Sequence, residues 1–508
     1  MKKMNGGMIM SKEIVLPSGV IGIGAEYKEQ ILEEFKDNPF IEVLPDLIGK
    51  EDMIKKLSFK VNIKKEELLL PKQLKLAAIN RIYKVFQPLP IHIEVWDMVN
   101  LLIRQGYISR NPFNKSYTRY INNTGESIIN KNFNIDANKN FRTTVQSGLI
   151  IGVSGMGKTT TVQRVLSNIP QVIIHKQYKN TQFPQIQLTW LKLEAPANGS
   201  IKALTLQFFH KLDQLLGTNN VDKYVSKHLS VDAMLPIMGQ VANSVGLGLL
   251  IIDELQHLDK NFKQVMNYFV TLMNSFGVPL LLVGTPSCYD MLQQELRIAR
   301  RVTGAGAVFF NTMKNDKEFE IFLRGIWRYQ FIDKNVRLNK DIIDIFYEKT
   351  QGIADLVVKL FVSVQKIVIN KGLDNINVDL IKKVWDREYS MVNPMVEAIK
   401  SNNRVKKMRF EDIQEINITK ANTDLRGNTN RVKIELEDNK KQSTSKINKK
   451  IIEKEKAVKI KIEDLDDTDI RKIVIQGKKK NNLSTYESLN RAGLITTIDD
   501  LLLEIKNT

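Results

Sequence analysis

A glycine-rich segment that ends in lysine and threonine has the residue types of a phosphate-binding loop. Residues 152–159, Gly-Val-Ser-Gly-Met-Gly-Lys-Thr, match the pattern G-x-x-x-x-G-K-S/T at every fixed position. The apolar run 148–153 predicts a buried strand before the loop, and helical spacing of apolar residues in 160–167 predicts a helix after it. The alternative, a plain glycine turn, does not require this order of elements. Because helix starts attract phosphate, the segment predicts a nucleotide-binding site.

A second run combines four aliphatic residues with two acids. Residues 249–254, Leu-Leu-Ile-Ile-Asp-Glu, predict a strand that ends at Asp253 and Glu254. Asp253 and the Thr159 hydroxyl would hold Mg²⁺, Lys158 would reach the β- and γ-phosphates of ATP, and Glu254 would orient the attacking water. By itself, this run also fits an edge strand ending in solvated carboxylates. The expected nucleotide contacts are Gly152, Val153, Ser154, Gly155, Met156, Gly157, Lys158, Thr159, Thr160 and Asp253.

Further apolar runs complete a predicted sheet. Residues 278–285 form an apolar run that ends at Thr285, whose hydroxyl is a candidate sensor of the γ-phosphate, although it could merely end a strand. Residues 171–175 and 188–193 predict two more strands. Five strands alternating with helical stretches predict a doubly wound α/β domain. Its ligand would bind at the carboxyl ends of the parallel strands.

Two basic features are candidates for contacts beyond the nucleotide. Three arginines, Arg297, Arg300 and Arg301, have the spacing of one helix face. They could act on the nucleotide of a neighbouring subunit, or they could form a solvated or DNA-facing basic helix. Lys202 follows a predicted turn and helix cap at 198–200, in a first turn where the helix dipole disfavours a cation. It could contact DNA phosphate or be an ordinary solvated lysine.

Composition narrows the classes of partner. The 508 residues suffice for about two to four structural units, and the formal net charge is +19. A field of that sign favours nucleic acid as partner, with acidic lipid as the rival. No run approaches the ~18 apolar residues of a membrane span, and the amino terminus does not resemble a secretory signal. The single cysteine, Cys288, permits neither an internal disulfide nor a cysteine metal site. We therefore expect a cytoplasmic protein.

Four regions follow along the chain. Residues 1–125 predict a helical partner-binding region, with helices at 27–35 and 91–104. Residues 126–335 would form the ATPase core, and 336–400 a helical lid with helices at 341–349 and 354–369. Residues 401–508 combine a lysine-rich stretch, predicted to be a flexible basic linker, with a terminal segment of acidic and apolar residues. That composition is typical of a peptide that docks on a partner.

The chain resembles TnsC, the AAA+ ATPase family that regulates target choice in Tns-type transposons. The resemblance covers nearly the whole chain, with a poorer match after residue 400. The segments that carry it are 37–45, 106–112, 251–258, 296–301, 351–361 and 465–471. It implies an AAA+ core that binds ATP and Mg²⁺, hydrolyses ATP slowly, and assembles as a ring or helical filament on double-stranded DNA of largely any sequence. It also implies links to transposase subunits and a target-site selector, in the bacterial cytoplasm on DNA. Lys202 is similar to DNA-contacting positions of the family.

One departure from the family pattern concerns the lid. Many AAA+ lids carry a sensor arginine in the segment that here spans 352–355, whereas this chain has Asp355.

Other function classes stay open: a replication initiator or helicase loader of the same clade, a signalling NTPase without DNA, or a scaffold without turnover. Glu254 argues against the scaffold and the net charge against the signalling protein. The initiator is weakened because no helix-turn-helix pattern follows the lid.

Overall fold

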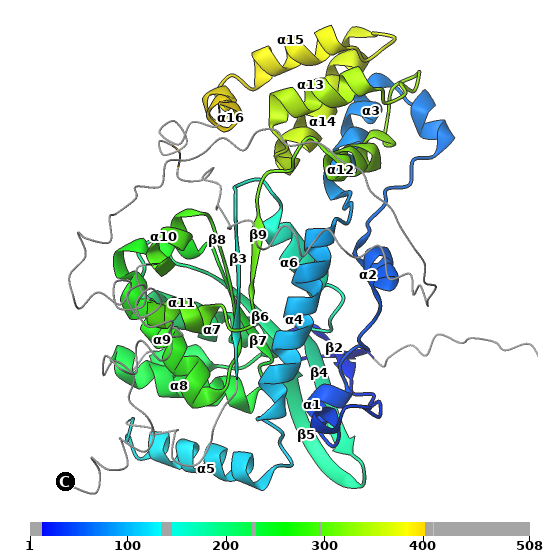
Figure 1. Cartoon of the computed structure of the whole chain (residues 1–508). Helices are drawn as coiled ribbons and strands as arrows, with labels where there is room; N and C mark the ends of the chain where they lie inside the picture. The colour runs from blue at the N-terminus through cyan, green and yellow to red at the C-terminus, as the bar shows by residue number, and fades with distance from the viewer. Residues whose placement is uncertain (1–12, 134–144, 226–229, 294–295, 402–409, 411–508) are drawn as a thin grey trace, which may run out of the picture. The chain divides into compact units, whose positions relative to one another are not determined.

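The computed structural model describes residues 13–133, 145–225, 230–293, 296–401 and 410 (Figure 1). The predicted linker and docking segment of 401–508 lie outside the described residues, apart from residues 401 and 410. Among the described helices, none combines the length and the hydropathy needed to cross a lipid bilayer.

A five-stranded, fully parallel sheet forms the centre of the fold. Its strand order is β6-β7-β8-β3-β9, so β8 lies between the strand before the glycine loop and the strand that ends in acids. All five carboxyl ends therefore meet at one edge, which confirms the predicted doubly wound parallel sheet. The bounds are β3 Ser147–Gly152, β6 Trp190–Glu194, β7 Leu249–Asp253, β8 Leu280–Gly284 and β9 Ala307–Phe310.

One strand assignment from the sequence was wrong. Residues 172–175 of the predicted strand 171–175 belong to β4, which lies in a second sheet of order β1-β2-β4-β5. β9 takes the fifth place in the central sheet. The cause is local, because Tyr178 pairs with Thr181 across a two-residue turn in which Lys179 has a φ of 50°. This turn commits β4 to an antiparallel hairpin with β5. The bounds are β1 Glu13–Val15, β2 Ile21–Gly24, β4 Val172–Tyr178 and β5 Thr181–Leu188.

Helices cover both faces of the central sheet. Alternate strand residues such as Ile150 and Ile251 pack with the buried sides of α4 and α6, whereas Ile151 and Ile252 pack with α7, α8 and α9. The strands are therefore mainly apolar on both faces, as expected for a parallel sheet covered on both sides, with charged residues only at Lys192, Glu194 and Asp253. The bounds are α4 Pro90–Ile108, α6 Lys158–Leu166, α7 Ile201–Leu216, α8 Val231–Ser244 and α9 Phe262–Phe276.

The region before the sheet is mainly helical, with the two short strands β1 and β2. The predicted helix 91–104 lies inside α4, but the predicted helix 27–35 was wrong, since only Glu33–Phe35 forms a single 3-10 turn, η1. Ile31 stays 94% exposed, so this apolar spacing does not mark a buried helix face. The other helices here are α1 Pro39–Glu42, α2 Lys50–Leu57, η2 Lys65–Leu69, α3 Lys72–Ala78, η3 Ile79–Lys84 and α5 Lys115–Ile129.

Helices fill the range in which a lid was expected. The predicted helices 341–349 and 354–369 are both present, within α13 Lys340–Thr350 and α14 Ala354–Lys371. α15 Val378–Glu388 and α16 Asn393–Lys400 follow them. The remaining helices are η5 Val221–Val225, η6 Leu255–Asn261, α10 Ser287–Gln293, α11 Leu296–Val302 and α12 Lys317–Trp327.

Candidate nucleotide-binding site

The glycine loop joins β3 to α6 at the carboxyl edge of the sheet. Gly155 and Gly157 have φ angles of +81° and +83°, a conformation that side-chain-bearing residues rarely adopt. At Gly152 a Cβ atom would lie 2.3 Å from the carbonyl oxygen of Phe310, so the close approach of β9 requires glycine. The Lys158 ammonium donates to the carbonyls of Gly152 at 2.7 Å and Val153 at 3.2 Å. The loop therefore wraps around its own lysine at the start of α6.

Thr159 and Asp253, predicted from separate motifs, are in direct contact. The Thr159 hydroxyl donates to Asp253 Oδ2 at 2.9 Å, and Asp253 Oδ1 accepts the N–H of Glu254 at 2.9 Å. Asp253 is only 3% exposed. A hydroxyl beside a carboxylate, next to a phosphate loop, is an oxygen donor set that suits Mg²⁺. These residues therefore fit the predicted ion.

Sequence reasoning missed a lysine that contacts the same carboxylate. Lys192, on β6, places its ammonium 2.7 Å from Asp253 Oδ2, and the side chain is only 15% exposed. The available signal was a lysine inside the apolar run 190–193, where a charged residue needs a partner. The site thus contains two lysines, Lys158 from the loop and Lys192 from the sheet.

Glu254 and Thr285 are connected through a second residue that was not predicted. The Gln256 side-chain amide donates to Glu254 Oε2, and its Oε1 accepts the Thr285 N–H at 3.2 Å. The Thr285 hydroxyl lies 2.9 Å from the Ser287 hydroxyl. Glu254 itself has a φ of 58°, which is uncommon for a residue with a side chain. Gln256 therefore fixes the orientation of the Glu254 carboxylate relative to the end of β8.

Two neighbouring groups have packing roles. His257 Nδ1 lies 3.3 Å from the carbonyl of Ala195, which ties η6 to the end of β6. Cys288 is fully buried, and burial raises the pKa of its thiol to about 12. The thiol is therefore neutral at physiological pH.

The three candidate arginines differ in their surroundings. All lie on α11, where Arg300 is exposed. The Arg301 guanidinium donates to the Asn274 side chain of α9, and its carbonyl accepts the Ser147 hydroxyl at 2.7 Å. Arg301 thus attaches α11 to the sheet and to α9 within its own chain, while Arg300 is available to another molecule. Only the backbone of Arg297 is described.

Lys202 lies where its local sequence predicts. The Ser200 hydroxyl caps α7 by accepting the N–H of Ala203 at 3.2 Å, and Lys202 is exposed in the first turn. An exposed lysine at a helix start presents its charge to solvent despite the unfavourable dipole. The position is accessible to a polyanion.

The lid helix α14 begins against the glycine loop. The Asp355 N–H donates to the carbonyl of Gly155 at 2.9 Å. The Asp355 carboxylate pairs with Lys359 one turn later, at 2.7 Å. An acidic side chain therefore occupies the position beside the loop where the resemblance leads one to expect an arginine.

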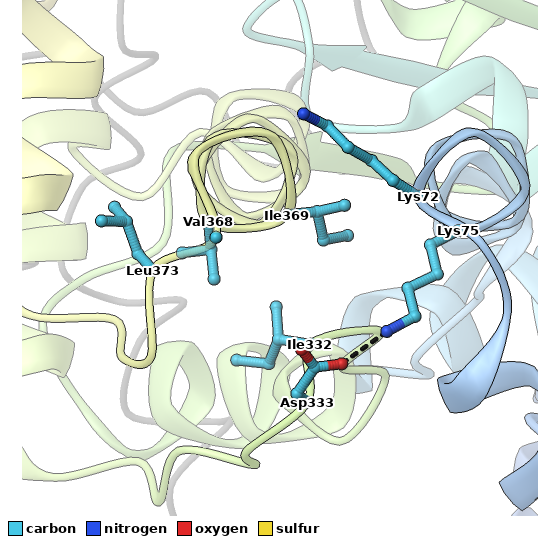
Figure 2. A pocket seen from close by; sticks show the side chains of 8 residues that line it. Lys72, Lys75, Ile332, Asp333, Val368, Ile369 and Leu373 are labelled. Atoms are coloured by element: carbon cyan, nitrogen blue, oxygen red, sulfur yellow. Dashed lines mark hydrogen bonds and ion pairs between the residues drawn. The ribbon is translucent and has the colours of Figure 1, made fainter.

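The cavity in Figure 2 is at a different place. It has a volume of about 130 Å³ and lies between α3 and the end of α14. Lys75 pairs there with Asp333 at 2.5 Å, and apolar residues such as Ile332 and Val368 complete the wall. None of the predicted site residues lines it. The glycine loop and the predicted site residues therefore lie away from this cavity, at the carboxyl edge of the central sheet.

Comparison with protein families matches residues 142–292 to an AAA domain. This range contains the glycine loop, both acids and Thr285, and it ends before α11. No curated protein matches the chain. The match shows an AAA domain over residues 142–292. The structure adds a five-stranded parallel sheet with helices before and after it, and the two findings together agree with the predicted fold class.

Several solved structures are similar to parts of the chain. The Aeropyrum pernix ORC1 protein in complex with DNA has 12% identity over 53% of this chain and 64% of its own, with a TM-score of 0.34. Drosophila ORC bound to DNA has 12% identity over 61% of this chain and 70% of its own, with a TM-score of 0.33. The Thermotoga maritima RuvB Holliday junction branch migration motor has 14% identity over 53% of this chain and 67% of its own, with a TM-score of 0.28. The chain thus spans less than two-thirds of the Aeropyrum protein.

Proposed function

We propose that this chain is an ATP-dependent, DNA-binding regulator of transposition that oligomerises on target DNA and connects a target-site selector to the transposase. Binding of ATP with Mg²⁺ is supported above all by the contact between Thr159 and Asp253 beside the glycine loop. The resemblance to TnsC supports the role in transposition, in the bacterial cytoplasm on DNA. The proposed division of labour is partner binding by 1–125, ATP hydrolysis by 126–335, lid movement by 336–400 and transposase docking by the segment within 401–508.

The proposed reaction is slow hydrolysis of ATP to ADP and phosphate. The N–H groups of the loop and Lys158 would bind the phosphates, and Thr159 with Asp253 would hold Mg²⁺, which would supply charge neutralisation to the phosphates. Glu254 would orient the attacking water and accept its proton, while Gln256 holds the carboxylate in place. Thr285, at the tip of the strand between β3 and β7, would contact the γ-phosphate.

The exposed arginine supports action between subunits. Arg300 would contact the nucleotide of a neighbouring copy, because Arg301 is engaged within its own chain and Arg300 is exposed. Arg300→Ala and Lys158→Ala proteins should each hydrolyse little ATP. In a mixture, the intact glycine loop of an Arg300→Ala subunit can lie next to the intact arginine of a Lys158→Ala subunit. We therefore expect a rate of phosphate release at least about tenfold above that of either protein alone.

A control variant makes that mixing experiment specific. A chain carrying both Lys158→Ala and Arg300→Ala can offer neither group and should rescue neither single variant. Absence of rescue between the single variants, while light scattering shows that they still co-assemble, would count against an arginine supplied by a neighbouring subunit.

The DNA contact proposed for Lys202 has a measurable signature. Lys202→Ala should weaken binding to all duplex sequences alike and reduce the slope of log affinity against log salt by about one. Fluorescence anisotropy with two unrelated duplexes, at several salt concentrations, measures both quantities. Lys382→Ala, which removes another exposed lysine from α15, is the control. Equal affinity and slope in native and Lys202→Ala protein would remove this residue from the DNA surface.

The role in transposition is tested by capture of purified partners. The full chain, assembled on duplex DNA with ATP and Mg²⁺, should retain the transposase of a Tns-type element. Retention of a replicative helicase in place of the transposase would favour the helicase-loader alternative.

A further inference from the structure

Asp253 carries two partners on one oxygen atom. Oδ2 accepts the Thr159 hydroxyl at 2.9 Å and lies 2.7 Å from the Lys192 ammonium. The register of β6 and β7 explains how the lysine reaches it. Lys192 is opposite Ile251, two residues before Asp253, so all three side chains leave the same face of the sheet. This is the face that α6, the helix of Thr159, also covers.

The ion pair between Lys192 and Asp253 is largely withdrawn from water. The two side chains are 15% and 5% exposed. An ionised carboxylate that is shielded from water costs folding free energy unless a cation or several hydrogen bonds compensate its charge. In this structure Lys192 supplies that cation. The backbone at Lys192 is also held, because the Lys211 ammonium donates to its carbonyl at 2.7 Å. The lysine is therefore presented to Asp253 by a fixed strand.

We propose that Lys192 is a positioning residue that competes with Mg²⁺ for Asp253, and this inference rests on the proposed binding of ATP and Mg²⁺. A cation that approaches Thr159 and Asp253 meets an oxygen already engaged by an ammonium group, and the two positive charges repel each other. Lys192 must release or share Oδ2 before the ion can use it. The lysine thus keeps the affinity for the bare ion low, and binding of Mg²⁺ depends on the negative charge that nucleotide phosphates add.

The test measures magnesium binding rather than turnover. The Mg²⁺ concentration that half-saturates binding of a fluorescent ADP analogue is compared between native protein and Lys192→Met. Removing the competing charge should lower that concentration about tenfold, within the range typical of coupled sites. The melting temperature without Mg²⁺ should fall, because Asp253 loses its counter-ion. Lys382→Met, which removes an exposed lysine of α15, should leave the half-saturating Mg²⁺ concentration unchanged.

A second variant keeps the test decisive if Lys192→Met does not fold. Lys192→Gln retains a hydrogen-bond donor toward Asp253 but removes the charge, so it should lower the half-saturating Mg²⁺ concentration in the same direction. If native protein binds the analogue but the folded variants have an unchanged or higher half-saturating Mg²⁺ concentration, the proposed competition is wrong and the proposed function still stands. Native protein that binds no adenine nucleotide with or without Mg²⁺ would instead overturn the proposed function.

Discussion

Glu254→Gln is expected to slow ATP hydrolysis by about a hundredfold or more while leaving ATP binding intact. The amide keeps the size and shape of the side chain but cannot take a proton from water. Gln256, which now donates to the carboxylate, still finds an acceptor oxygen in the new amide. Phosphate release under saturating ATP measures the loss, and equilibrium binding of ATP measures what is retained. The variant should also remain on duplex DNA longer in the presence of ATP, because its bound nucleotide is not consumed.

Lys158→Ala provides the contrasting control for that experiment. Lys158 lies inside the loop, so its removal takes away a cation that the phosphates require. This variant should lose binding as well as hydrolysis. Glu254→Gln protein that hydrolyses ATP at the native rate would show that another group activates the water.

The central sheet was predictable where a strand was a continuous apolar run. β3, β7 and β8 are buried at every position, and their sequences show it directly. β4 also begins with apolar residues, but its pairing was decided by the turn at Lys179 and by β1 and β2. β9 has only four residues, Ala307–Phe310, too few for periodicity to separate a strand from a short helical or loop segment. Pairing partners, rather than local pattern, therefore decided the fifth strand.

The candidate site shows the same division between local and tertiary information. Gly152–Thr159 and Asp253–Glu254 are contiguous segments whose chemistry follows from residue order. Lys192 becomes part of the site only through the register of β6 against β7. Gln256 does so only because η6 returns toward the end of β8. Helical spacing placed the three arginines on one face of a helix, but only packing against α9 distinguishes Arg301 from Arg300.

The contact between α14 and the glycine loop depends on Gly352, which lies between α13 and α14. Gly352 has a φ of +73°, and its carbonyl accepts the N–H of Met313, just after β9. A Cβ atom there would lie 2.1 Å from the Met313 carbonyl oxygen, a backbone atom that cannot move aside as a flexible side chain could. Three residues later, Asp355 donates to Gly155 in the glycine loop. Gly352 therefore sets the position from which the start of α14 contacts the glycine loop.

Gly352→Ala is expected to lower the free energy of unfolding and to weaken nucleotide binding together. The left-handed backbone should cost about 1–2 kcal/mol in a residue with a side chain. The collision with Met313 should add about 1–3 kcal/mol, as for other overpacked sites. Relief of the collision would move Asp355 away from Gly155, so affinity for ATP should fall as well. Urea unfolding midpoints and equilibrium ATP binding measure the two effects.

Gly372→Ala separates the collision from the backbone strain. Gly372 also has a left-handed φ, +62°, but a Cβ atom there would have no neighbour within 4 Å, and the residue ends α14 far along the chain from the loop contact. This variant should show the strain cost of about 1–2 kcal/mol alone, with native ATP affinity. If the two variants were equally stable and bound ATP equally well, the junction between β9 and the lid would be able to adapt, and Gly352 could not be what fixes the lid against the glycine loop.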